Sequence, residues 1–154
     1  QYPHDHYPMW RDHLGGHDLL SRYGAFGENI VATGLTENRV HIGDRFRIGG
    51  ALLEISQPRQ PCWKIEHRFA RKGMINHILR THACGWYYRV IEEGEAEAGD
   101  AIERVEVGHA EWSVARVFAA LFDPDDRTTP ADLRAIANLD RLCPQWRGKA
   151  RDLF

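Results

Sequence analysis

The chain is organised around the stretch Ala51-Leu52-Leu53-Glu54-Ile55-Ser56-Gln57-Pro58-Arg59-Gln60-Pro61-Cys62-Trp63-Lys64-Ile65. Its first five residues form a mainly apolar, strand-like run, whereas the two prolines fix φ near the extended value and remove two backbone donors. A strand that enters such a segment cannot continue its ladder, so we expect Cys62 on a stiff loop at the strand's end. Arg59 and Lys64 flank this cysteine, and nearby cations favour the thiolate, the form that binds metals or attacks electrophiles. Because cysteine is often buried in proteins, an inert structural thiol is the alternative.

The composition sets the class of protein. A chain of 154 residues suits one domain, or a core with a small appendage. A formal charge of −2 and a pI of about 6.5 predict no general binding to nucleic acid or to anionic membranes. No apolar run approaches the ~18 residues of a membrane span, and no signal peptide is visible. The three cysteines lie far apart in the sequence, which favours reduced thiols in the cytoplasm over a disulfide framework: Cys62, Cys84 and Cys143.

Strand-like patterns dominate the middle of the chain. Val40–Ile48 and Ala51–Ile55 are predicted strands joined at Gly49-Gly50, a strong signal for a two-residue hairpin loop. Gly85–Ile91 is rich in aromatic and β-branched residues, and Ala101–Val107 alternates as a returning strand would. Short strands and tight turns of this kind favour a sheet-dominated, barrel-like core.

Helical patterns lie before and after these strands. Pro3 is placed as the first residue of a helix that ends at Gly15-Gly16, and Trp63–Thr81 is predicted to be helical with an interruption at Gly73. Four histidines crowd the first of these segments: His4, His6, His13 and His17. A zinc site would need two of them on one helical face, but the glycine pair breaks the turn, so we interpret them as an exposed polar face.

From Gly108 onward the pattern changes to three short amphipathic helices. Ser113 is a predicted N-cap of the first, Thr129-Pro130 opens the second, and Pro144 opens the third, whose apolar side includes Leu153. Helices this short bury little on their own, so we expect them to dock on the β core or on a partner. Helix-turn-helix binding to DNA is an alternative that the scarcity of basic residues in the third helix disfavours.

A glycine-rich segment precedes the predicted strand Ile30–Thr33: Gly24-Ala25-Phe26-Gly27-Glu28-Asn29. Its glycines allow a tight turn and a close approach of the backbone to a ligand. Glu28 and Asn29 would then present an acceptor and a two-way amide. A simple turn without a ligand is the other interpretation.

These motifs together resemble the MOSC domain family, named after the C-terminal domain of molybdenum-cofactor sulfurases. The resemblance rests on four motifs in order: residues 24–30, residues 42–49 followed by Pro58–Ile65, Gly85–Val90, and Ala98-Gly99-Asp100. It is strongest to the YiiM-type subfamily, in which a three-helix segment follows the core. The resemblance implies a β-rich α+β fold, with a MOSC-type β-barrel core over residues 1–107 and a three-helix appendage over 108–154. In the family, a stretch with a His-Gly-Gly-type motif and several strands precedes the equivalent of Gln1, so we expect the core shown here to lack its N-terminal portion.

The resemblance also implies a chemistry. MOSC domains bind a molybdenum cofactor (molybdopterin), and Cys62 would supply the thiolate to the metal. The positions that match the family's cofactor-binding motifs are Phe26, Gly27, Glu28, Asn29, Arg59, Gln60 and Lys64. YiiM-type relatives reduce N-hydroxylated bases such as N-hydroxylaminopurine to amines. No Gly-x-Gly-x-x-Gly follows a strand, so the electrons would come from an external flavoprotein reductase.

Other roles for the cysteine stay open. In sulfurase relatives the MOSC domain is fused to a separate domain that carries pyridoxal phosphate, and Cys62 would then handle sulfur for the cofactor. A cofactor-binding carrier module without redox turnover is a further alternative, and so is a structural domain with an inert thiol.

Overall fold

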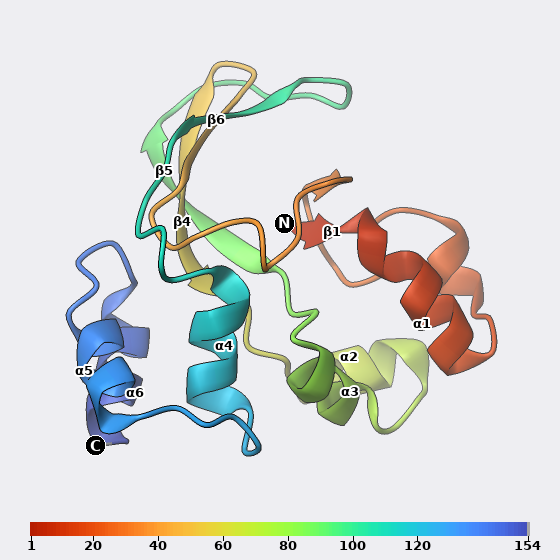
Figure 1. Cartoon of the computed structure of the whole chain (residues 1–154). Coiled ribbons are helices and arrows are strands. Elements are labelled where there is room, and N and C mark those ends of the chain that lie inside the picture. The colour runs from red at the N-terminus through yellow and green to blue at the C-terminus, as the bar shows by residue number, and fades with distance from the viewer. Residues whose placement is uncertain (154) are drawn as a thin grey trace.

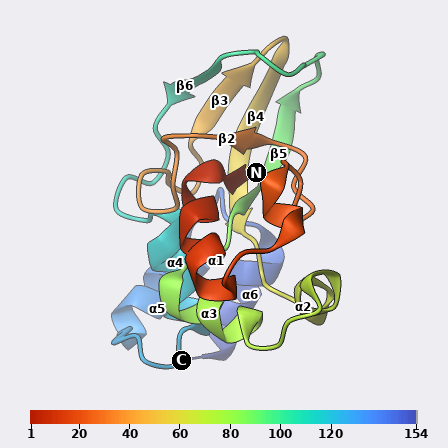
Figure 2. The same ribbon diagram turned by 90° about the vertical axis from the view of Figure 1, so that its right-hand side faces the viewer.

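The computed structural model of the chain describes residues 1–153 and has an α+β fold (Figure 1). Four strands form an antiparallel sheet in the order β5-β4-β3-β6. Their bounds are β3 (Arg45–Ile48), β4 (Ala51–Pro58), β5 (Trp86–Glu92) and β6 (Ile102–Glu106). A separate parallel pair joins β1 (Tyr2–Pro3) to β2 (Val31–Ala32). Figure 2 shows the larger sheet standing above the helices.

The predicted hairpin is confirmed. Ile48 lies opposite Ala51, so Gly49-Gly50 form the two-residue loop, and Gly49 takes the left-handed φ of 54° that such a loop requires. The strand before it is shorter than expected, because the pairing begins at Arg45. The strand after it is longer and ends at Pro58, opposite Trp86. The prediction that the strand stops at Ile55 is therefore wrong, since the register shifts just beyond that residue and admits a proline.

β6, the last strand in the sequence, lies at the opposite edge of the sheet from β5. β6 pairs with β3 and not with β5, so it is no simple return strand. The connection crosses the tip of the hairpin, where the backbone N–H of Gly50 donates to the carbonyl of Glu95 at 2.8 Å. β5 and β6 are the two edges of this sheet, and residues 1–153 form no closed barrel.

The N-terminal segment begins with β1, not with a helix at Pro3 as predicted. It continues through a 3₁₀ turn (η1, His4–His6) into α1 (Tyr7–Leu14), whose first turn accommodates Pro8, and then to η2 (Asp18–Ser21). Gly15 ends α1 in the left-handed conformation, as expected. The region after the cysteine is divided near Gly73, as predicted, into α2 (Trp63–Phe69) and α3 (Met74–Thr81).

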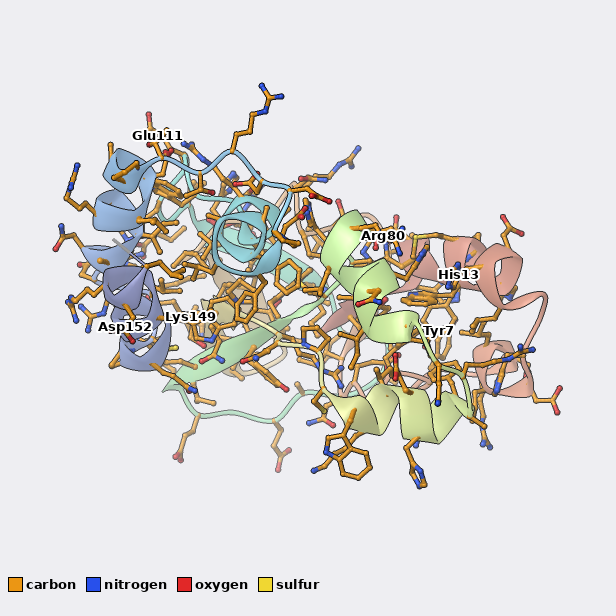
Figure 3. All side chains as sticks on the ribbon, turned by 90° about the horizontal axis from the view of Figure 1, so that it is seen from below. Tyr7, His13, Arg80, Glu111, Lys149 and Asp152 are labelled. Atoms are coloured by element: carbon orange, nitrogen blue, oxygen red, sulfur yellow. The ribbon has the colours of Figure 1, made fainter. Side chains whose placement is uncertain are left out.

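The C-terminal segment forms the three predicted helices: α4 (Val114–Phe122), α5 (Pro130–Ala137) and α6 (Pro144–Asp152). Ser113 caps α4, and Thr129 forms a capping box with Asp132 at α5. Leu153, expected on the apolar side of α6, is instead exposed. Phe154, the last residue of the predicted segment, lies outside the described residues. In Figure 3, Lys149 and Asp152 of α6 lie at the opposite end of the molecule from His13 of α1.

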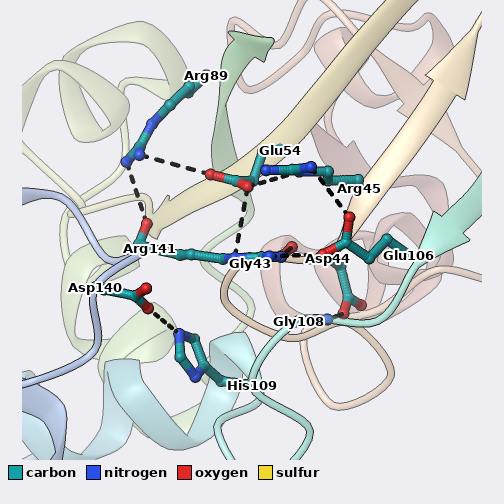
Figure 4. Close-up of polar contacts among 10 residues, drawn as sticks. All are labelled: Gly43, Asp44, Arg45, Glu54, Arg89, Glu106, Gly108, His109, Asp140 and Arg141. Carbon is teal, nitrogen blue, oxygen red and sulfur yellow. Dashed lines mark hydrogen bonds and ion pairs between the residues drawn. The ribbon is translucent and has the colours of Figure 1, made fainter.

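A polar network attaches this helical segment to the sheet (Figure 4). Arg141, between α5 and α6, donates to the carbonyl of Gly43 at 3.0 Å and pairs with Glu106 at 2.6 Å. Arg89 of β5 donates to the carbonyl of Arg141 at 3.1 Å. The backbone N–H of Cys143 bonds to the carbonyl of Ser56 in β4 at 3.0 Å. The helices therefore dock on the β core, as expected. None of the helices in the described part of the chain has the length and apolar character needed to cross a membrane.

Candidate functional site

Cys62 lies on the loop between β4 and α2, as the proline pattern predicts. Its backbone is extended, with φ −136° and ψ 165°, and its side chain is exposed. Within residues 1–153 all three cysteines are free, but their settings differ. Cys84 is buried, its thiol donates to the carbonyl of Gly85 at 3.2 Å, and burial raises its pKa well above the usual range. Cys143 is partly buried at the start of α6. Cys62 is thus the accessible thiol among the three.

The segment Gly24–Glu28 folds around the Glu28 carboxylate. Oε1 accepts from the N–H of Gly24 at 3.1 Å and from the hydroxyl of Tyr7 at 2.5 Å, while Oε2 accepts from the N–H of Phe26 at 2.8 Å. Burial and the bond to this carboxylate both raise the pKa of Tyr7. Gly24 and Gly27 adopt φ values of 81° and 73°, which only glycine takes without strain. Glu28 therefore organises its own loop, and Asn29 lies exposed beside it.

Two arginines from the Cys62 segment hold the outside of this loop. Arg59 Nη2 donates to the carbonyl of Phe26 at 2.7 Å. Arg68 Nε donates to the carbonyl of Ala25 at 2.7 Å, and its Nη2 to that of Gly24 at 3.0 Å. Three consecutive carbonyls of the loop are therefore occupied by guanidinium groups that lie on either side of Cys62 in the sequence. The structure brings together the two segments that the sequence singled out.

An aromatic cluster packs around Phe26 and anchors the loop in the core. Phe26 is buried and stacks on Tyr2, with ring centroids 4.2 Å apart. Tyr7 and Trp10 approach the same ring, and Phe69 at the end of α2 approaches it at 5.2 Å. Phe26 therefore serves as the anchor of the loop in the core, while its neighbours Gly27 and Asn29 face outward.

A cavity of about 270 Å³ lies against this loop. Its lining includes Gly27, Glu28, Asn29 and Arg59, together with Gln1, Ile30, Leu53, Trp86, Tyr87, Tyr88 and Val90. Four of the predicted site residues thus share one wall. Phe26, Gln60, Cys62 and Lys64 are not part of this lining; Gln60 and Lys64 lie exposed near the thiol.

Two residues of the cavity lining carry buried hydrogen-bond donors. The indole N–H of the fully buried Trp86 and the amide Nε2 of Gln1 are buried and have no partner within residues 1–153. Buried donors of this kind are rare unless a ligand or water satisfies them. Sequence reasoning missed both residues, because an aromatic strand position and an isolated glutamine carry no sign of a site.

The N-terminal histidines have separate partners and do not gather around a common point. His6 contacts Glu37 at 2.6 Å, His17 contacts the carbonyl of Phe69 at 3.0 Å, and His13 stacks on His77. Over the range that the structure describes, no three His, Cys, Asp or Glu side chains are grouped as a metal site would require.

Comparison with known families gives a clear assignment. The model of the MOSC domain matches residues 1–103. The chain belongs to the MOSC domain family. A second model, the YiiM-like 3-alpha helix domain, matches residues 112–153 of this MOSC protein.

Individual relatives agree with this assignment. The chain is 38% identical over 146 residues to YflK of Bacillus subtilis (strain 168), which covers 95% of this chain and 64% of YflK. A protein of Gibberella moniliformis named "Reductase" is 40% identical over 118 residues, or 76% of this chain and 21% of that protein. The crystal structure of YiiM from Geobacillus stearothermophilus superposes with a TM-score of 0.90 at 34% identity, covering 98% of this chain and 75% of YiiM. The chain therefore spans less than two thirds of the length of these two curated relatives.

Proposed function

We propose that this MOSC protein binds a molybdenum cofactor (molybdopterin) and reduces N-hydroxylated compounds, such as N-hydroxylaminopurine-like bases, to amines. Membership of a family associated with this cofactor supports the binding, and the fungal relative named "Reductase" supports the reaction class. The observation that carries the proposal is the Cys62 thiol, which is exposed and lies on a loop fixed between β4 and α2.

The residues present fit such a group. Sulfur is the soft ligand that a sulfur-rich molybdenum centre accepts, and Cys62 offers an exposed sulfur donor. The pterin part carries hydrogen-bond acceptors and a phosphate, and the Arg59 guanidinium in the cavity lining complements such a ligand. These observations concern the donor set of the protein and support the fit independently of the family.

In this proposal the residues divide into ligand-binding and supporting groups. Cys62 holds the metal, while Gly27, Asn29 and Arg59 bind the organic part from the cavity wall. Gln60 and Lys64 lie at the surface near the thiol, within the segment that the resemblance assigns to the cofactor. Phe26 and Glu28 act from inside the loop, because their contacts are to the protein. When bound, the cofactor supplies a two-electron reduction, in which a hydroxylamine, two electrons and two protons give an amine and water.

The partners follow from what the chain offers. A small N-hydroxylated molecule is the substrate, and an external flavoprotein reductase supplies the electrons; pyridoxal phosphate belongs only to a separate domain in sulfurase relatives. We propose no binding to nucleic acid or to a membrane surface, and a reducing compartment such as the cytoplasm suits three free thiols. Residues 1–107 would carry the cofactor and residues 108–154 would stabilise the sheet.

The test is Cys62→Ser, with Cys143→Ser and Cys84→Ser as controls. Serine is nearly isosteric but lacks the soft sulfur donor, so we expect at least a tenfold loss of bound molybdenum and no turnover of an N-hydroxylated base. Elemental analysis and an assay with a reduced viologen as electron donor measure the two effects. Both controls should keep metal and activity.

Two other outcomes have defined meanings. A wild-type protein that binds the cofactor but never turns over would indicate a carrier module or a sulfur-handling role. A folded Cys62→Ser protein with full metal content and full activity would refute the thiolate-ligand mechanism.

A further inference from the structure

Arg68 lies at the far end of the helix that begins beside Cys62. Helix α2 spans seven residues, or about 10 Å at 1.5 Å per residue, with Cys62 before its first residue and Arg68 in its last turn. In sequence this arginine reads as one of several scattered cations near the cysteine. In the structure two of its nitrogens are directed at backbone carbonyls of the glycine-rich loop.

The contact between α2 and the loop has a polar and an apolar part. The Arg68 guanidinium bonds to the carbonyls of Gly24 and Ala25, and the neighbouring Phe69 ring packs near that of Phe26. Arg59, before Cys62, bonds to the carbonyl of Phe26. The segment that carries the thiol is therefore attached to the loop at two points, one on each side of the cysteine.

These attachments determine where the thiol lies relative to the cavity wall. The N–H groups of Gly24 and Phe26 bond to the Glu28 carboxylate and that of Gly27 bonds to the carbonyl of Gly24, so the loop is cross-linked within itself. The N–H of Ala25 bonds to the hydroxyl of Tyr7 at 3.4 Å, which joins the loop to α1. Without the bonds from Arg68, the end of α2 would keep its core packing through Phe69 and its contact with His17, but its polar attachment to this loop would be lost. The thiol would then be held less tightly relative to Gly27 and Asn29.

We propose that Arg68 is a positioning residue for the reaction, which holds α2 against the Gly24–Glu28 loop and so fixes the Cys62 thiol relative to the cofactor-binding wall. The proposal rests on the proposed function for its catalytic part. It assigns to Arg68 a geometric role that depends on its two-pronged guanidinium and not on its positive charge.

The first test uses the protein without cofactor and needs no activity. Hydrogen exchange of the amides in residues 24–28 should be about threefold to tenfold faster in Arg68→Ala, because two charge-assisted bonds to the loop are lost. Arg71→Ala removes the same charge three residues later, where the side chain has no bond to any of residues 1–153, and should leave this exchange unchanged. Equal exchange in the two variants would overturn the proposal.

The second test uses the molybdenum-loaded protein and separates geometry from charge. At equal molybdenum content, Arg68→Ala should lower kcat at least tenfold while KM changes less than threefold, because the reacting groups are misplaced. Arg68→Lys keeps the charge but not the planar fork, and should recover less than half of the lost kcat. Full recovery with lysine would show that charge near the anionic cofactor is what matters. If even the wild type reduces no N-hydroxylated substrate, the proposed function fails, and the exchange experiment still decides whether Arg68 fixes the loop.

Discussion

Glu54 is the buried acid at the junction between the sheet and the C-terminal helices. Its side chain is nearly inaccessible, and its oxygens lie 2.9 Å from Arg45 Nε and 3.5 Å from Arg89 Nη1 (Figure 4). Arg141 approaches the same carboxylate at 3.9 Å. The three guanidinium groups replace part of the hydration that burial removes from this carboxylate.

Glu54→Gln removes the charge and keeps the shape. A hydrogen bond to a charged group contributes roughly 1.5–3 kcal/mol, and water can replace part of the loss because the three arginines are partly exposed. We expect the free energy of unfolding to fall by about 1–3 kcal/mol, or the melting temperature by roughly 2–12 °C for a chain of this size. Glu106 bonds to two of the same arginines but is 39% exposed, so Glu106→Gln should cost less than about 1 kcal/mol.

Thermal and urea unfolding of the two variants provide the measurement. The loss of unfolding free energy should be larger for the buried Glu54 than for the more exposed Glu106, although both carboxylates contact Arg45 and Arg141. Equal losses in the two variants would refute it. A more stable Glu54→Leu protein would show that the desolvation of the carboxylate exceeds the gain from its partners.

Two further predictions concern His77 in α3 and the C-terminal helices. Burial lowers the pKa of His77, and the stacked ring of His13, 3.7 Å away, lowers it further. Stability should therefore be constant above the unfolded-state value of about 6.5 and should fall as the pH drops below it, because the unfolded chain takes up the proton more readily. Unfolding curves between pH 5 and 8 measure this, and His77→Asn should flatten the profile. Removal of residues 108–154 should lower the melting temperature by uncovering the surface that Phe118 and Trp146 bury; equal stability with a specific loss of turnover would show that the helices shape the site.

The sequence was sufficient to predict the turns and helix starts that depend on residues close together in the chain. The glycine pair at 49–50 fixes a hairpin through its backbone conformation, and Thr129 fixes a helix start through a side chain three residues from its partner. The pairing of β6 with β3 was not predictable in this way. It depends on a connection that crosses the hairpin tip, and the alternation in the sequence is the same for either neighbour.

The candidate site likewise has a part that the sequence predicts and a part that it does not. The loop that carries Cys62 is predictable from the proline pattern, although Pro58 ends β4 and only Pro61 lies in the loop itself. The partners of the nearby charges do not follow from any pattern. Glu28 reads as a free acceptor in sequence, but its oxygens bond to backbone N–H groups and to a tyrosine from another element. Long-range contacts between a side chain and a backbone group leave no periodic signal, because any carbonyl can accept from an arginine.

The two arginines on either side of Cys62 illustrate what this difference means for function. Arg59 matches a cofactor-binding position in the sequence and Arg68 is one of several cations in the predicted helix, yet both donate to loop carbonyls in the structure. Arg59 uses one guanidinium nitrogen for this purpose and lines the cavity, so donors remain for a ligand. Arg68 uses two nitrogens and is absent from the cavity lining. The same residue type thus serves as a ligand-binding group at one position and as a positioning group at the other, and variants of the two arginines should differ accordingly: loss of Arg59 should weaken cofactor binding, whereas loss of Arg68 should spare binding and slow turnover.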